Sequence, residues 1–86
     1  MIVKLPSVLR SYTGDLAEVE LEGGTVDELL QALDRRFPGV RFRLVDEAGR
    51  LRRHIKLYVG SEATEDLDAP LAEGSTLQIV AALSGG

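Results

Sequence analysis

The chain has 86 residues, a net charge of −4 and no cysteine, which allows one small domain and excludes disulfides, thiolate metal sites and iron–sulfur centres. Its residues are 44% hydrophobic and 28% charged, a globular composition that excludes disordered, collagen-like and coiled-coil proteins. The acidic balance also argues against nucleic acid as the main partner, because duplex binding normally requires a basic surface.

No segment has the pattern of a targeting or membrane-spanning sequence. The N-terminal residues Met1–Pro6 lack the long apolar stretch of a signal peptide. No run of apolar residues approaches the roughly 18 that a membrane-spanning helix needs. We therefore expect a cytoplasmic protein without a membrane partner.

The first quarter of the chain predicts an opening β-hairpin. The short, β-branched segment Ile2–Leu5 is typical of a strand, and residues 7–16, which include Ser, Thr, Gly and Asp, are typical of a loop or turn. Segment Ala17–Glu22 then alternates small or apolar residues with glutamate. This alternation predicts a half-buried strand with Val19 and Leu21 pointing inward.

An amphipathic helix is predicted next. Thr25 and Glu28 have the spacing of a capping box, in which each side chain accepts a hydrogen bond from the other residue's backbone N–H. Pro38-Gly39 ends the helix. Segment Val40–Leu44 then predicts either a short second helix or a loop with Phe42 as a packing anchor. The apolar residues that recur at helical spacing are Val26, Leu29, Leu30, Leu33 and Phe37.

The second half of the chain predicts two more strands. Segment His54–Val59 alternates, which indicates a half-buried strand. Residues 61–75 are polar and irregular, and we expect Leu67 and Leu71 to anchor them to the core. Segment Thr76–Leu83 carries no charge and is typical of a strand covered on both sides by neighbours.

The order strand, strand, helix, short helix, strand, strand favours an α+β domain of two layers, because one helix can cover only one face of a sheet. We predict a β-grasp (ubiquitin-like) fold that forms a single domain over residues 1–86. A mixed four- to five-stranded sheet packs on one main helix in this fold. The last strand lies parallel to the first, between the two hairpins.

The sequence ends on Ser84, Gly85 and Gly86, directly after the last predicted strand. We expect residues 84–86 to form a flexible tail. No charged residue occurs between Glu73 and the terminal carboxylate. Glycines would let this tail enter a narrow channel and would leave its last carbonyl open to attack. A frayed end without a role is the alternative.

An ionised α-carboxylate is a poor electrophile and must be activated before it reacts, for instance as an acyl adenylate. The chain has neither a phosphate-binding loop nor a dinucleotide fingerprint. If the tail reacts, a partner enzyme must therefore supply the ATP chemistry, and the chain itself binds no cofactor.

The other titratable residues favour surface roles over a catalytic site. His54 has no second histidine or cysteine near it, so a surface or packing role is favoured. Glu18, Glu20 and Glu22 share one strand face with a period of two, which is typical of a solvent face. No two carboxylates are placed together in a pocket, and we predict that the protein is not an enzyme by itself.

Two patterns are candidate partner surfaces. One basic cluster precedes and enters the third predicted strand, and it is either a solvated face or a contact for an acidic partner. Its members are Arg50, Arg52, Arg53 and Lys56. The outward positions of the last strand form a docking patch if exposed, which we favour because one helix covers only one sheet face. These positions are Gln78, Val80 and Ala82.

In this order, the motifs resemble the MoaD/ThiS family of ubiquitin-like sulfur carriers over essentially the whole chain. Each motif is short, but their order and the terminal diglycine make the resemblance fairly specific. The motifs are Val3–Pro6, Leu9-Arg10, Thr13-Gly14, Thr25–Leu30, Phe37–Gly39, Asp46–Arg52, Leu57–Gly60, Thr76–Val80 and Ser84–Gly86. The stretch Arg50–Gly60 looks closest to the longer carriers associated with cysteine biosynthesis.

The resemblance implies a carrier that acts through its tail. An E1-like enzyme of the MoeB/ThiF type would use ATP to adenylate Gly86, and a sulfur source would then convert it to a thiocarboxylate. Sulfur would pass to an acceptor such as a cysteine synthase or the molybdopterin synthase large subunit, and a zinc metalloprotease is a further candidate partner. Ser84 and Gly85 would thread into the partner. The docking residues would be Lys56, Gln78, Val80, Ala82 and Leu83.

Two departures from the family leave the acceptor open. Many relatives carry Asn where this chain has Lys56, and many have proline before the tail where this chain has Ala81–Leu83. Other functions also remain open: the small subunit of molybdopterin synthase, a ubiquitin-like modifier joined to protein lysines, and an interaction domain with an inert tail.

Overall fold

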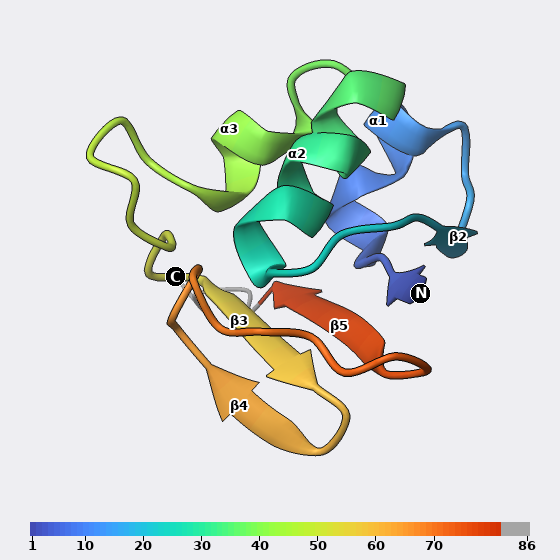
Figure 1. Cartoon of the computed structure of the whole chain (residues 1–86). Coiled ribbons are helices and arrows are strands. Elements are labelled where there is room, and N and C mark those ends of the chain that lie inside the picture. The colour runs from blue at the N-terminus through green and yellow to red at the C-terminus, as the bar shows by residue number, and fades with distance from the viewer. Residues whose placement is uncertain (82–86) are drawn as a thin grey trace.

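The computed structural model describes residues 1–81 and shows a five-stranded sheet with its helices on one face (Figure 1). Across the sheet the strands follow the order β2-β1-β5-β3-β4. The strands are β1 (Ile2–Lys4), β2 (Glu18–Glu20), β3 (Ile55–Val59), β4 (Glu62–Thr64) and β5 (Thr76–Ala81). The helices are the 3₁₀ helix η1 (Ser7–Leu9), α1 (Arg10–Thr13), α2 (Val26–Arg36) and α3 (Val40–Leu44).

Strand β5 lies at the centre of the sheet. It pairs parallel with β1 and antiparallel with β3, with Leu77 beside Val3 and Ile79 opposite Leu57. All four of these side chains are buried. The predicted β-grasp arrangement, with the last strand parallel to the first between two hairpins, is therefore confirmed.

Helix α2 begins where the capping box predicts. The Thr25 hydroxyl accepts from the Glu28 backbone N–H at 3.2 Å, and the Glu28 carboxylate accepts from the backbone N–H of Thr25 at 3.2 Å and of Gly24 at 2.8 Å. Asp27 and Glu28 in the first turn also favour the positive end of the helix dipole. The helix ends at Arg36, and its C-cap residue Phe37 precedes Pro38, which cannot continue a helix.

The core lies between α2 and the sheet face that α2 covers (Figure 1). Helix α2 contributes four fully buried side chains: Val26, Leu29, Leu30 and Leu33. Leu67 and Leu71 are partly buried against this core, as predicted. Their segment is also tied by its backbone, because the Leu71 N–H donates to Gly24 and the Asp27 N–H donates to Leu67.

Residues 7–16, predicted as a loop or turn, instead contain two short helices, η1 and α1. The turns bury Leu9 and Thr13 and end at Gly14, which has a left-handed φ of 65°. Three and four residues are too few to show a helical period in the sequence. The prediction was wrong because burial of these side chains, rather than periodicity, stabilises the turns.

Strand β4 was also missed, because residues 61–75 were expected to be irregular. It follows the turn at Gly60, whose φ is 62°, and its three residues pair antiparallel with β3 at the edge of the sheet. Between Val40 and Leu44 the structure forms the short helix, one of the two predicted alternatives. Phe42 is 60% exposed, so its role as a packing anchor was wrong.

Candidate functional site

Within residues 1–81, no element covers the central strand on the sheet face opposite the helices. In β5 the side chains of Leu77 and Ile79 are buried beneath the helices, whereas the alternate positions point the other way. Of these, Gln78 is exposed and Val80 is half-buried. The docking positions predicted in the described part of the last strand therefore lie on an open surface.

Strand pairing brings further side chains to this surface. Lys56 lies opposite Val80 and Tyr58 lies opposite Gln78, both across the β3–β5 ladder. The parallel β1 places Ile2 and Lys4 beside the other edge of β5. We call this surface the open face, and its residues are Ile2, Lys4, Lys56, Tyr58, Gln78 and Val80.

The open face combines apolar contact area with two cations. Ile2 is 40% exposed, and Val80 and Tyr58 are half-buried between the exposed side chains of Lys4 and Lys56. Lys56 was expected on this surface from the resemblance, and Tyr58 of the same strand was missed, as were Ile2 and Lys4 of β1. Those two belong to the site only because β1 pairs with β5 from the far end of the chain, which no local pattern reveals.

Ala81 is the last residue that the structure describes, and it lies directly opposite Ile55 at the start of β3. The remaining residues predicted for the site lie outside the described residues. These are the docking residues Ala82 and Leu83, the tail residues Ser84 and Gly85, and the reactive residue Gly86.

The predicted basic cluster is divided in space. Lys56 lies on the open face, whereas Arg50, Arg52 and Arg53 lie on the loop that leads into β3. That loop begins with a turn at Asp46, whose carboxylate accepts from the backbone N–H groups of Ala48 at 2.9 Å and Arg50 at 3.0 Å. The hydrogen bond from Arg50 is the main cause that holds the pKa of Asp46 below its ordinary value of 3.8.

The acidic residues have structural or solvent-exposed positions. Glu18 and Glu20 are exposed on either side of buried Val19, as the alternation predicts. Asp27 instead pairs with Arg41 at 2.6 Å and ties α2 to α3. Across residues 1–81 no group of three or more His, Cys, Asp or Glu side chains could hold a metal ion. Over the same residues, no helix is long and apolar enough to cross a membrane.

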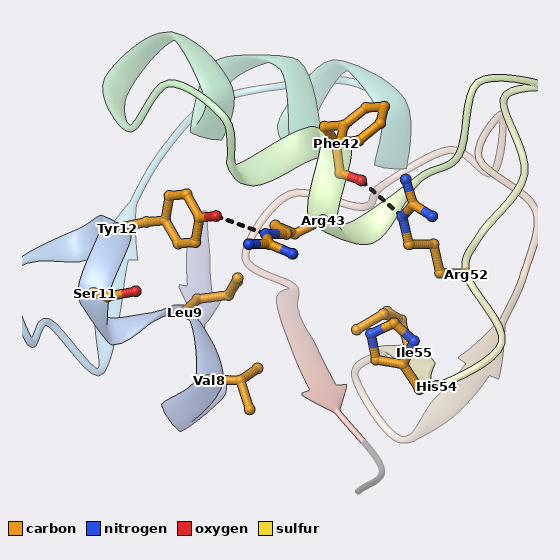
Figure 2. A pocket seen from close by; sticks show the side chains of 9 residues that line it. All are labelled: Val8, Leu9, Ser11, Tyr12, Phe42, Arg43, Arg52, His54 and Ile55. Atoms are coloured by element: carbon orange, nitrogen blue, oxygen red, sulfur yellow. Dashed lines mark hydrogen bonds between the residues drawn. The ribbon is translucent and has the colours of Figure 1, made fainter. Parts of the chain in front are cut away.

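A pocket that sequence reasoning did not find lies on the helix side of the sheet (Figure 2). It joins Arg43 from α3 with Arg52 and His54 from the loop before β3, and His54 is exposed. Arg43 and Arg52 are nine positions apart in the sequence. The fold brings them together because backbone hydrogen bonds return the loop to the end of α3, where the Arg52 N–H donates to Leu44.

Comparisons with known proteins agree on one family. The family model described as ThiS matches residues 3–86. The sulfur carrier protein CysO of Mycobacterium tuberculosis is 30% identical over 89 aligned positions, which cover 98% of this chain and 96% of the relative.

Solved structures are similar over the same length. A chain of the Amycolatopsis orientalis BexX/CysO complex is 38% identical with a TM-score of 0.90, and the match covers 99% of this chain and 98% of that one. The structure of SAMP1 from Haloferax volcanii is 31% identical with a TM-score of 0.78, covering 100% and 98%. The chain therefore belongs to the ThiS family, and it is a protein of the CysO/ThiS sulfur-carrier type.

Proposed function

We propose that this protein carries sulfur on the α-carboxylate of Gly86 and acts as a protein substrate, not as an enzyme. An E1-like enzyme of the MoeB/ThiF type transfers AMP from ATP to the carboxylate, and pyrophosphate leaves. Sulfide then attacks the acyl carbon and AMP leaves, which gives the thiocarboxylate. The observation that carries the proposal is the match to the ThiS family, which extends through Gly86 itself.

The acceptor that we propose is an enzyme of cysteine biosynthesis. The similarity to CysO proteins over nearly the whole chain supports this choice. In this scheme a cysteine synthase-like enzyme accepts the carried sulfur, and a zinc metalloprotease is a further candidate partner. The molybdopterin synthase large subunit is the alternative acceptor. Because activation consumes ATP, we place the cycle in the cytoplasm.

The open face is the proposed docking surface for the activating enzyme. Its apolar centre at Val80 and Tyr58 can be buried against a partner, and Lys56 and Gln78 beside it can make polar contacts. In the proposal Ala82 and Leu83 extend this surface, and Ser84 and Gly85 lead the carboxylate into the enzyme.

The decisive experiment is an intact-mass measurement. The full chain is incubated with ATP, sulfide and the E1-like enzyme encoded in the same genome. We expect the mass to rise by the difference between one sulfur and one oxygen atom. A chain that lacks Gly86 is the matched control and should keep both its fold and its original mass. If the full chain acquires neither an adenylate nor a thiocarboxylate, the proposal fails.

A ubiquitin-like modifier is the second candidate, favoured by the similarity to SAMP1 from Haloferax volcanii. The same acyl adenylate can be captured by a lysine amine in place of sulfide, which forms an amide and releases AMP. Conjugates of high molecular mass in cell extract, absent when Gly86 is deleted, would favour this function. A thiocarboxylate without such conjugates would favour the carrier.

A further inference from the structure

The pocket on the helix side of the sheet is open and has a volume of about 500 Å³, within the range of pockets that hold a small ligand or a few side chains. Buried Leu9 and Ile55 lie on its apolar floor. At its rim Val8 is 48% exposed and Phe42 is 60% exposed. Exposed apolar side chains of this size around one pocket are typical of contact surfaces.

Two arginines in this pocket are held in place by neutral partners (Figure 2). The Nε of Arg43 donates to the Tyr12 hydroxyl at 2.6 Å, and its guanidinium lies 5.6 Å from the centre of the Tyr12 ring. The Nε of Arg52 donates to the Phe42 carbonyl at 2.7 Å, and its guanidinium lies 4.8 Å from the centre of the Phe42 ring. These contacts orient both guanidinium groups through partners that carry no charge, and Arg52 also attracts the Asp46 carboxylate, whose pKa it helps to lower.

Neither arginine forms an ion pair within residues 1–81, where the recorded salt bridge joins Arg41 to Asp27. The two positive groups lie beside exposed His54 on a protein whose net charge is −4. An oriented guanidinium with its terminal N–H groups available is suited to bidentate binding of a carboxylate. The pocket therefore has the charge and geometry to receive an anionic side chain.

We propose that this pocket, which we call the Arg43–Arg52 pocket, binds an acidic side chain and a neighbouring apolar side chain of the enzyme that activates the tail. The inference rests on the proposed function and adds a second contact to it. Ala81, the last residue that the structure describes, lies opposite Ile55, and Ile55 lies on the pocket floor. An enzyme that contacts Ala81 is therefore placed beside this pocket.

The apolar rim favours a protein segment over a free anion. A small anion would use the guanidinium groups and leave Val8 and Phe42 in water, whereas a segment with an apolar residue beside its carboxylate buries both. The pocket lies on the helix side of the sheet and the open face lies on the other side. The enzyme would thus contact the chain on both sides of the sheet, beside Ala81.

The test measures binding of the E1-like enzyme to the chain that lacks Gly86, because this chain keeps the pocket but cannot be activated. We expect R43Q/R52Q to weaken binding about tenfold or more at low salt, with a smaller loss as salt rises. R43K/R52K should bind with intermediate affinity, because it keeps the charge and loses the planar fork. Calorimetry gives the dissociation constants, and circular dichroism checks the fold of each variant.

The matched control is R35Q/R36Q, which removes the same charge from α2 at residues that do not line the pocket. It should bind within about twofold of the parent chain. Equal dissociation constants for the two double variants would overturn the inference, and so would failure of the parent to bind. If the parent chain forms a dimer and R43Q/R52Q does not, while enzyme binding is unchanged, the pocket would be assigned to a second copy of this chain. Binding through the pocket without any mass increase in the full chain would overturn the proposed function alone.

Discussion

Gly23 lets the chain pass very close to the first turn of α2, because it has no Cβ atom. A Cβ atom built on Gly23 would lie 2.8 Å from the backbone nitrogen of Leu29 and 3.1 Å from the backbone carbon of Glu28. Real Cβ atoms do not approach backbone atoms so closely. A larger residue would therefore clash at this position. The segment that follows β2 passes this close because it crosses the start of α2 to form the capping box.

We predict that Gly23→Ala destabilises the fold by about 1–3 kcal/mol, since the helix backbone cannot move aside without losing core contacts. Gly24→Ala is the matched control, because its Cβ would meet only the end of the flexible Glu28 side chain, at 3.0 Å. Urea unfolding of both variants checks the prediction. Equal unfolding free energies for the two would show that the close approach at Gly23 costs nothing.

For single residues, hydrogen bonds between near neighbours can be predicted from the sequence, whereas contacts between residues that are distant in the sequence cannot. The capping box could be predicted because Thr25 and Glu28 are three positions apart and each side chain accepts from the other residue's backbone N–H. The Gly23-Gly24 pair could be recognised only as a break in the pattern. The different tasks of the two glycines depend on which helix atoms lie beside each one, and this is known only from the structure.

Helix α3 is too short to be stable alone, and one side chain of α2 holds its start. The Asp34 carboxylate accepts from the backbone N–H groups of Gly39 at 3.0 Å and Arg41 at 3.1 Å. Gly39 has a φ of 99°, which lets the chain reverse direction between the helices. Because α3 contributes Arg43 to the pocket, Asp34 also positions that arginine.

We predict that Asp34→Ala lowers the free energy of unfolding by about 1–2 kcal/mol, as expected for a lost helix cap. Asp34→Asn should cost less, because its amide oxygen can still accept both hydrogen bonds. Hydrogen exchange of the α3 amides should accelerate in the alanine variant before global unfolding. Unchanged exchange at Arg43 and Leu44 would contradict the prediction and assign the stability of α3 to its buried side chains alone.

The longest elements were predicted from a pattern that they repeat, and the three-residue strands β1 and β2 were predicted from the β-branched or alternating residues of the longer segments in which they lie. Helix α2 has eleven residues and shows the helical period clearly, and β5 has six residues without charge. The elements that were missed, η1, α1 and β4, have three or four residues each. Such elements are stabilised by neighbours that are distant in the sequence, so their own residues carry little signal.

At the scale of the whole molecule, charge is distributed unevenly. The net charge is −4, yet six of the ten lysine and arginine residues lie between positions 41 and 56: Arg41, Arg43, Arg50, Arg52, Arg53 and Lys56. In the sequence, Asp46 and Glu47 divide this segment, and the predicted basic cluster consists of Arg50, Arg52, Arg53 and Lys56. The fold separates it, because Lys56 lies on the open face and Arg43 and Arg52 lie on the helix side. The basic cluster could be predicted from the sequence. That its members lie on two different surfaces of the fold could not be predicted.

Changes on the open face and in the Arg43–Arg52 pocket should weaken enzyme binding independently if one enzyme contacts both surfaces. Val80→Asp places a charge in the apolar centre of the open face, and R43Q/R52Q removes charge from the pocket. We predict that each change weakens enzyme binding about tenfold and that the combination weakens it about a hundredfold, because effects at separate sites add in free energy. Ala72→Asp, on an exposed loop away from both surfaces, is the control for the added charge.

Additivity is tested by calorimetric titration of the activating enzyme with the parent chain, Val80→Asp, R43Q/R52Q and the combined variant, with Ala72→Asp as the control. Independent losses would mean that the enzyme contacts both sides of the sheet at once, so the end of β5 is clamped before the tail enters the active site. A combined variant that binds no worse than the weaker single-surface variant would contradict this clamp. If R43Q/R52Q by itself leaves binding of the activating enzyme unchanged, the pocket serves a different partner, and the acceptor becomes the protein to test against it.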